Sequence, residues 1–327
     1  MSNLFRKVLV TGGAGFIGSN LVDRLLEEGA DKIIIIDNFV TGQRQNVTHL
    51  LNDHRVEIIE QDLTDSTWLA NWLASQNLEP LTFIFHFASP ASPPRYQARP
   101  VLTYLVNSLV THHLAQYTSQ YSTRLFFAST SEVYGDPLVN PQSESYWGNV
   151  NPNGLRSCYD ESKRLGETIC GVWHRQTGAD VRQARIFNTY GPRMDIDDGR
   201  VIPSFFQSIL NNEALTVFGT GEQTRSFCYI DDLIEGIIRF AKNDDLSGQT
   251  INLGNPQEFN LLELVKIFEE LSGQNLEKQF SELPADDPTR RRPDITKARR
   301  LLNWEPQVDL LTGLQKTYEY FKQQSGK

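Results

Sequence analysis

The sequence has few cysteines, and none is placed to form a redox pair. Its 327 residues include only Cys158, Cys170 and Cys228, without a Cys-x-x-Cys spacing. A scattered, odd-numbered set favours reduced thiols and predicts a cytoplasmic protein. Spacing typical of a metal site is also missing, because the adjacent His112 and His113 would point to different faces of a helix. We therefore expect no metal centre.

Long apolar runs and an excess of positive charge are absent as well. No stretch of 18 apolar residues occurs, which argues against a spanning helix, and the first seven residues lack the apolar core of a secretory signal. The net charge is −9 at pH 7 and the pI is about 5.2. An acidic surface disfavours nucleic acid and anionic membranes, so we expect neither as a partner.

The sequence instead alternates short apolar runs with longer amphipathic stretches. The apolar runs are rich in Val, Ile and Phe, as in strands that are buried on both faces of a parallel sheet. The amphipathic stretches at 16–28, 66–77, 100–121 and 156–178 predict helices. This alternation predicts an α/β fold with a Rossmann-like, doubly wound parallel sheet. The predicted strands are Lys7–Thr11, Lys32–Asp37, Val56–Glu60, Phe83–Ala88, Leu125–Ser129 and Asp180–Phe187.

The pattern changes from about residue 190. A strand at Thr250–Leu253 is expected to return to the large sheet, whereas Pro284–Pro293 predicts an irregular loop with a basic cluster. Two interleaved domains follow: a Rossmann domain of residues 1–189 and 226–257, and a smaller, discontinuous α/β lobe of residues 190–225 and 258–327. Further helices are predicted near 203–212, 231–243, 261–272, 296–302 and 310–324.

A glycine-rich segment follows the first predicted strand. Gly12, Gly15 and Gly18 have the spacing Gly-x-x-Gly-x-x-Gly, and Phe16 and Ile17 begin the next helix. Small residues at these positions let backbone N–H groups approach a pyrophosphate at the helix N-terminus. The strand before the glycines and the helix after them favour a dinucleotide site over a plain glycine turn.

The end of the second strand indicates which dinucleotide binds. Asp37 lies 22 residues after Gly15, where a carboxylate would hydrogen-bond the adenosine ribose and repel a 2′-phosphate. NAD is therefore favoured over NADP. The neighbouring Asn38 belongs to the same predicted site, and Asp62 and Leu63, after the third strand, are expected beside the adenine.

A candidate catalytic pair begins the helix predicted at 156–178. Tyr159 and Lys163 are four residues apart and therefore share one face of that helix. A nearby ammonium is expected to stabilise the phenolate and lower the pKa of the tyrosine. Such a tyrosine can take a proton from a sugar hydroxyl while hydride passes to NAD⁺.

With these motifs in place, the chain resembles the extended short-chain dehydrogenases that act on nucleotide sugars. Within them it is most similar to the UDP-glucuronic acid decarboxylases, or UDP-xylose synthases, from about residue 7 to residue 310. The segments that carry the likeness are 88–96 (ASPASPPRY), 130–137 (TSEVYGDP), 185–194 (RIFNTYGPRM), 223–227 (QTRSF) and 291–295 (RRPDI).

The resemblance implies roles for individual residues. Tyr159 would be the acid and base, Lys163 its partner that also binds the nicotinamide ribose, and Thr130 would hydrogen-bond the sugar near the reacting carbon. Arg291 matches the family arginine near the sugar carboxylate. Ala88 and Ser89 would contact the cofactor. The remaining nucleotide-sugar contacts would come from Pro90, Tyr96, Asn188, Arg193 and Arg225.

Enzymes of this kind share oxidation at C4 of the sugar and differ in the fate of the 4-keto intermediate. Dehydratases carry an aspartic acid where this chain has Ser131, and serine is a poor general acid at neutral pH. Epimerases usually have a small neutral residue at the position of Glu132. Decarboxylation fits better, because oxidation of a glucuronate at C4 creates a β-keto acid, with Arg291 to hold its carboxylate and Glu132 to handle a proton. The predicted reaction converts UDP-glucuronate to UDP-xylose and recycles NADH internally.

Alternatives remain open. A dTDP- or UDP-hexose 4,6-dehydratase or 4-epimerase would share the same core, and a non-catalytic NAD-binding sensor is a hypothesis of another class. Sensors typically lose the tyrosine or the lysine, which this chain keeps. Leu105 replaces a family lysine near the ligands and leaves the sugar and base open. The resemblance also implies a homodimer, paired through the helices at 100–121 and 156–178.

Overall fold

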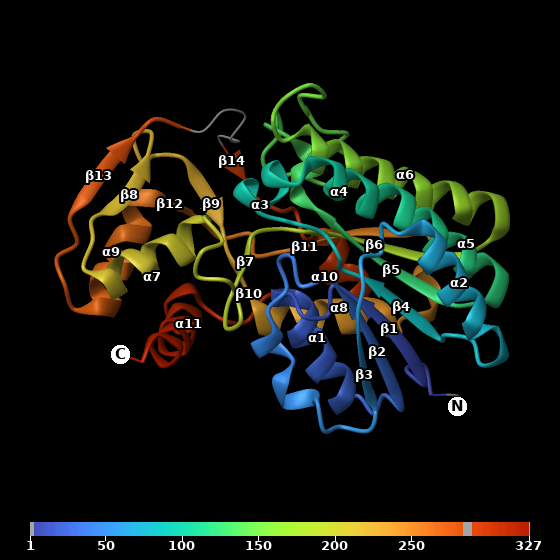
Figure 1. Ribbon diagram of the computed structural model, residues 1–327. Coiled ribbons are helices and arrows are strands. Elements are labelled where there is room, and N and C mark those ends of the chain that lie inside the picture. Colours follow the sequence, from blue (N-terminus) through green and yellow to red (C-terminus); the bar gives the residue numbers. More distant parts are fainter. Residues whose placement is uncertain (1–2, 284–289, 327) are drawn as a thin grey trace.

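The computed structural model describes residues 3–283 and 290–326, and its centre is a seven-stranded parallel sheet (Figure 1). The strand order is β11-β6-β5-β4-β1-β2-β3, and every neighbouring pair is parallel. The Rossmann-like prediction is confirmed, including the return of the late strand to this sheet. The strands are β1 (Lys7–Thr11), β2 (Lys32–Asp37), β3 (Val56–Glu60), β4 (Phe83–His86), β5 (Arg124–Thr130), β6 (Asp180–Ile186) and β11 (Thr250–Leu253).

Both faces of the sheet are buried because its strands are apolar on both sides. In β1, Val8 and Val10 belong to one hydrophobic core and Leu9 to another. Helices α1 (Phe16–Glu27) and α8 (Ile230–Lys242) pack together over the first core. The opposite face is covered by α2 (Ser66–Ser75), α4 (Pro100–Leu105), η4 (Val106–Val110), α5 (Thr111–Tyr121) and α6 (Ser157–Thr177).

The helix predicted at 100–121 contains one irregular turn. Between α4 and α5, the five residues of η4 form a π-helical turn. The carbonyl of Val106 in this turn contacts Nε2 of His86 at the end of β4 (3.1 Å). Turns of this kind often mark functional sites, and here the turn lies against the carboxyl edge of the sheet.

A smaller α/β region lies beside the sheet, at the left of Figure 1. Two short strands, β7 (Thr189–Tyr190) and β10 (Cys228–Tyr229), pair in parallel. They lie where the chain leaves the sheet for the smaller region and where it returns. Helix α10 (Thr296–Leu302) packs against β11 and α8. The elements of the smaller region are α7 (Val201–Asn211), β8 (Leu215–Phe218), β9 (Thr224–Ser226), β12 (Glu258–Asn260), α9 (Leu261–Ser272), β13 (Lys278–Ser281), β14 (Arg290–Arg291) and α11 (Leu310–Ser325).

The loop predicted at 284–293 is only partly a loop. Residues 284–289 lie outside the described residues, but Arg290 and Arg291 form β14, which pairs in parallel with β9. The prediction was wrong for these two residues, because a two-residue strand has no side-chain period to read. The pairing places Arg291 beside Arg225.

The remaining elements are short. They are α3 (Pro93–Ala98) and the turns η1 (Arg44–Asn46), η2 (Thr48–Leu50), η3 (Gln76–Leu78), η5 (Ser131–Tyr134) and η6 (Asp244–Leu246). Over the described part of the chain, no helix is long and apolar enough to cross a membrane. Within the same residues, no cluster of three or more His, Cys, Asp or Glu side chains could hold a metal ion.

Candidate active site

The predicted site residues meet in two adjoining cavities at the carboxyl edge of the sheet. The larger cavity has a volume of about 1020 Å³ and the smaller one about 70 Å³, and Gly12, Gly15 and Ser89 line both. The larger is also lined by Phe16, Ile17, Gly18, Tyr96, Thr130, Ser131, Glu132, Tyr159, Lys163, Asn188, Arg193, Arg225 and Arg291. The smaller is also lined by Asp37, Asn38, Asp62, Leu63, Ala88 and Pro90.

The glycine loop has the geometry of a phosphate site. Gly12 has φ +73°, and a Cβ added there would lie 2.6 Å from the backbone nitrogen of Ala88. At Gly18 an added Cβ would collide with the carbonyl oxygen of Gly12. Gly15 precedes α1, and no side chain caps the first turn of that helix. Its N–H groups and the positive end of the helix dipole are therefore available to a pyrophosphate.

Replacing Gly12 with alanine is expected to weaken NAD binding at least tenfold. The added methyl group would strain the backbone by about 1 kcal/mol and also push the loop away from Ala88. Gly29→Ala is the matched control, because Gly29 has a similar φ of +82° and no atom within 4 Å of an added Cβ. Calorimetric NAD titrations of both variants measure the effect. Equal NAD affinity in the two would contradict the role of the loop.

Asp37 is held in place by the backbone of that loop. Its carboxylate accepts hydrogen bonds from the N–H groups of Ala14 (2.9 Å) and Phe39 (2.8 Å). Burial raises the pKa of Asp37 despite these two bonds. Nearby, the amide of Asn38 donates to Asp62 (3.4 Å). The smaller cavity thus combines a fixed strand-end carboxylate with an apolar wall, which suits an adenosine.

Tyr159 and Lys163 lie one turn apart on α6 and are both buried. The Tyr159 ring stacks on that of Tyr96, with centroids 5.1 Å apart and planes 4° apart. The Lys163 ammonium donates to the carbonyl of Ala128 (2.7 Å) and lies 5.8 Å from the centre of the Tyr159 ring. The pair is therefore assembled with fixed orientations.

The expected direction of the Tyr159 pKa was wrong for the protein alone. Burial raises the pKa of Tyr159, and the hydrogen bond with Thr130 lowers it only in part. Burial also lowers the pKa of Lys163, to about 7. The Lys163 ammonium is hydrogen-bonded to the carbonyl of Ala128 and is buried, so the spacing on the helix alone does not set the pKa of the tyrosine.

A buried ion cluster lies beside the tyrosine. Glu132, in η5, is paired with both guanidinium nitrogens of Arg291, and the longer of these contacts is 2.9 Å. Arg156 donates to the same carboxylate (2.5 Å). Burial opposes ionisation of Glu132, but the charges of Arg291 and Arg156 outweigh it and lower its pKa to about 2. Glu132 is therefore an anion at neutral pH and has no proton to donate.

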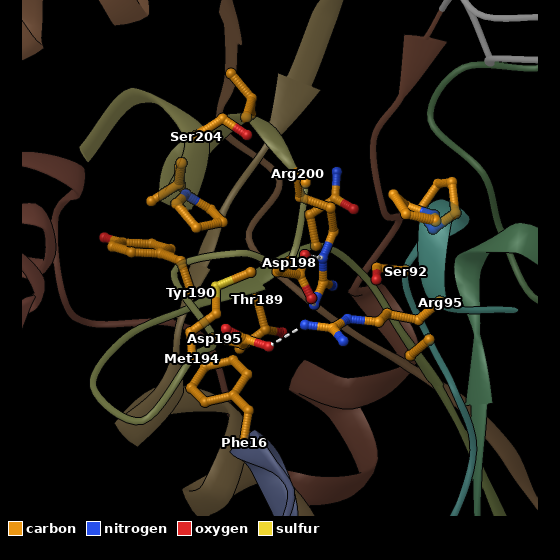
Figure 2. Close-up of a pocket in the computed structure, with 18 of the residues that line it drawn as sticks. Phe16, Ser92, Arg95, Thr189, Tyr190, Met194, Asp195, Asp198, Arg200 and Ser204 are labelled. Atoms are coloured by element: carbon orange, nitrogen blue, oxygen red, sulfur yellow. Dashed lines mark hydrogen bonds and ion pairs between the residues drawn. The ribbon is translucent and has the colours of Figure 1, made fainter. Parts of the chain in front are cut away.

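Sequence reasoning missed Arg156, although it lies three residues before Tyr159 and thus on the same helix face. That spacing was a usable signal. It also missed the charged residues on the loop between β7 and α7. Figure 2 shows Arg95, in α3, reaching across the larger cavity to Asp195 on this loop (2.6 Å). Arg200, from the same loop, lines the cavity beside Asp198.

The predicted ligand arginines already have partners within the protein. Arg193 donates to Asp23 of α1 (2.6 Å), and Arg225 donates to the carbonyl of Thr224 (2.9 Å). Leu105 does not line either cavity, whereas Leu102 and Val106 of the same segment line the smaller one. This part of the cofactor cavity is therefore apolar.

Comparison with known proteins agrees with this geometry. The model of the NAD dependent epimerase/dehydratase family matches residues 8–254. UDP-glucuronic acid decarboxylase 5 of Arabidopsis thaliana is 46% identical over 320 residues, which cover 98% of this chain and 90% of that protein.

Two solved structures are similar over nearly their whole length. One is a UDP-glucuronic acid 4-epimerase from Bacillus cereus in complex with UDP-glucuronic acid and NAD (TM-score 0.87, 30% identity, 97% and 99% of the two chains). The other is a dTDP-glucose 4,6-dehydratase from Streptomyces venezuelae with NAD bound (TM-score 0.87, 29% identity, 98% of each chain). The family model matches most of the chain, and the Arabidopsis relative is 46% identical to it. Together with the site geometry, these matches show that the chain belongs to the NAD dependent epimerase/dehydratase family.

Proposed function

We propose that the protein is a UDP-glucuronate decarboxylase, which converts UDP-glucuronate to UDP-xylose and CO₂. The observation that carries the proposal is the pair of buried guanidinium groups, Arg156 and Arg291, beside Tyr159. Both guanidinium groups also line the larger cavity, where they can donate hydrogen bonds to the carboxylate of a substrate. The identity with the Arabidopsis enzyme of that name supports the same reaction.

NAD is the cofactor, and the residues present fit it. The uncapped first turn of α1 and the close approach at Gly12 suit its pyrophosphate, and Asp37 suits its adenosine ribose. When bound, NAD would supply a hydride acceptor for C4 of the sugar and a hydride donor for the return step. The cofactor is thereby regenerated, so each turnover needs no external oxidant.

Tyr159 is proposed to take the proton of the C4 hydroxyl as the hydride leaves. The Thr130 side chain opposes the effect of burial on the pKa of Tyr159. Lys163 donates a hydrogen bond to Ala128 near the end of β5, and we propose that it also binds the nicotinamide ribose. The stacked Tyr96 limits rotation of the catalytic ring.

The 4-keto glucuronate is a β-keto acid, so its ketone accepts the electrons left by departing CO₂. Arg291 is proposed to orient the carboxylate, and Ser131, which is buried in the cavity wall, to hydrogen-bond the developing enolate. Glu132 fixes Arg291 by a two-point contact. C5 would then take one proton from water in place of the lost CO₂, and Tyr159 would return its proton to the C4 oxygen as the ketone is reduced again.

The same geometry disfavours the neighbouring reactions. A dehydratase needs an acid for the departing C6 hydroxyl, and neither Ser131 nor the ionised Glu132 supplies one at neutral pH. An epimerase needs space for the keto sugar to rotate, and the Glu132 ion cluster occupies part of the cavity wall.

The two-domain division proposed from the sequence gives each lobe a task. The sheet domain, residues 1–189 and 226–257, would hold NAD, and residues 190–225 and 258–327 would hold the nucleotide sugar. Pairing of two copies is also proposed, supported by exposed apolar side chains on α4 and α6, namely Val101, Tyr104, Leu165 and Val172.

The three free cysteines support a cytoplasmic location.

Incubation of the purified protein with NAD and a panel of nucleotide sugars tests the proposal. UDP-glucuronate should yield UDP-xylose and CO₂, detected by mass, with substoichiometric NAD. UDP-glucose and dTDP-glucose should give no dehydrated product. Formation of UDP-galacturonate would identify a 4-epimerase instead. Tight NAD binding without turnover of any sugar would favour a sensor.

A further inference from the structure

His86 is a buried polar side chain that the reaction above does not use. It ends β4, directly beside Thr11 at the end of β1, and it is 1% exposed. Its Nδ1 atom lies 2.7 Å from the Thr11 hydroxyl oxygen, and its Nε2 atom lies 3.1 Å from the carbonyl oxygen of Val106. Each ring nitrogen therefore has a partner, and the two partners belong to different elements.

The protons on these atoms follow from the partners. The Val106 carbonyl can only accept, so Nε2 of His86 carries the ring proton and donates it. Burial, with a smaller effect from the charge of Lys163, lowers the pKa of His86 to about 3, so the ring has no second proton at neutral pH. Nδ1 therefore accepts from the Thr11 hydroxyl, whose oxygen in turn accepts from the N–H of Ala88 (3.4 Å).

This chain of three hydrogen bonds connects three walls of the smaller cavity. Thr11 directly precedes Gly12 of the phosphate loop. Ala88 lies in the segment after β4, and Val106 begins the π-helical turn η4. Gly12, Ala88 and Val106 all line the cavity, whereas His86 and Thr11 do not. A π-turn interrupts the regular hydrogen-bond ladder of a helix, and here the ring N–H of His86 gives the Val106 carbonyl a partner.

We propose that His86 is a positioning residue for the adenosine half of NAD, because its two hydrogen bonds set the distance between the phosphate loop and the π-turn. The smaller cavity is narrow, at about 70 Å³, so a small separation of these walls would remove contacts from the adenine and its ribose. His86 acts through Thr11 and Val106, since it lines neither cavity itself. The inference concerns NAD alone and holds whichever sugar the enzyme converts.

Calorimetry with NAD and with ADP-ribose, which lacks the nicotinamide, tests the inference without any sugar substrate. His86→Leu removes both ring nitrogens without lengthening the side chain, and it should raise the Kd of both ligands about tenfold. His174→Leu is the matched control, because the His174 ring is bonded to the Ala179 carbonyl (3.0 Å) but lines neither cavity. The control should keep both Kd values within about twofold.

A second pair of variants separates positioning from packing, and it decides the question if His86→Leu does not fold. Thr11→Val keeps the shape of the side chain but removes the hydroxyl between His86 and Ala88, and it should also weaken NAD binding about tenfold. Thr11→Ser keeps the hydroxyl and should hold the affinity within about threefold. Because both residues act in one chain of bonds, His86→Leu combined with Thr11→Val should weaken binding little more than either change alone.

Unchanged NAD affinity in His86→Leu or in Thr11→Val would overturn the inference, even with a lower unfolding temperature, because His86 would then support only the fold. A loss that Thr11→Ser shares in full would overturn it as well. So would a loss for NAD that ADP-ribose does not show, since the effect would then lie at the nicotinamide. Absence of decarboxylation would reject the proposed function and leave these binding results standing, since none of them depends on turnover.

Discussion

Tyr159→Phe is expected to lower the rate of C4 oxidation by about 10³-fold and to leave NAD affinity within about twofold. The variant keeps the ring that stacks on Tyr96 but loses the hydroxyl that accepts the proton. Without a base at that position, hydride transfer would leave a protonated ketone, which is a poor product. Single-turnover NADH absorbance measures the rate, and calorimetry measures NAD binding.

A second tyrosine provides the control for loss of a buried phenol. Tyr117 is buried in α5, accepts a hydrogen bond from the N–H of Leu81 (3.2 Å) and lines neither cavity. Tyr117→Phe should cost some stability and leave the oxidation rate nearly unchanged. If Tyr159→Phe oxidises the sugar as fast as Tyr117→Phe does, another group is the base.

Arg291→Ala is expected to reduce kcat/KM for UDP-glucuronate by about 10²- to 10³-fold, because removal of one partner from a buried charge pair costs about 3–4 kcal/mol. Binding of UDP-glucose should weaken less than tenfold, because that sugar has no carboxylate. Thermal unfolding should occur at a lower temperature, since Glu132 would keep only Arg156 among the partners described above.

The adjacent residue supplies a matched control for this second variant. Arg292 is 42% exposed and lies 3.7 Å from Glu258, outside the two cavities. Arg292→Ala should leave both sugars nearly unaffected. Equal losses on UDP-glucuronate and UDP-glucose in Arg291→Ala would show that Arg291 supports the fold of the site and does not recognise the carboxylate.

The sheet and its edge could be predicted from the sequence because both depend on local pattern. Apolar runs such as Lys32–Asp37 are buried on both faces, and their composition can be recognised in the sequence alone. Carboxyl ends of parallel strands share one edge, so Gly12, Asp37 and Thr130 had to lie near one another.

The ion cluster could not be predicted in the same way. Arg291 pairs with a carboxylate 159 residues earlier, and no periodicity links such positions. The resemblance placed Arg291 near the substrate carboxylate, whereas the structure adds that Glu132 already engages it. The spacing of Arg156 to Tyr159 could have indicated that Arg156 lies near the site, but it could not have indicated that Glu132 is its partner.

The pKa of Tyr159 shows a second limit of sequence reasoning. Spacing on a helix brings Lys163 close to the tyrosine but does not reveal what else the ammonium contacts. In the structure it donates to Ala128, and burial has the larger effect on both side chains. Desolvation depends on the whole surrounding fold, so its size is invisible in a four-residue spacing.

The central claim, decarboxylation through a 4-keto sugar with internal return of the hydride, is tested most directly by isotope labelling. UDP-glucuronate carrying deuterium at C4 is converted in ordinary water, and the unlabelled substrate is converted in D₂O. The account predicts that the UDP-xylose from the first reaction keeps deuterium at C4 and that the second gains one deuterium at C5 only. Loss of the C4 label to solvent or to the free cofactor pool, or recovery of a product that still contains the carboxylate, would contradict it.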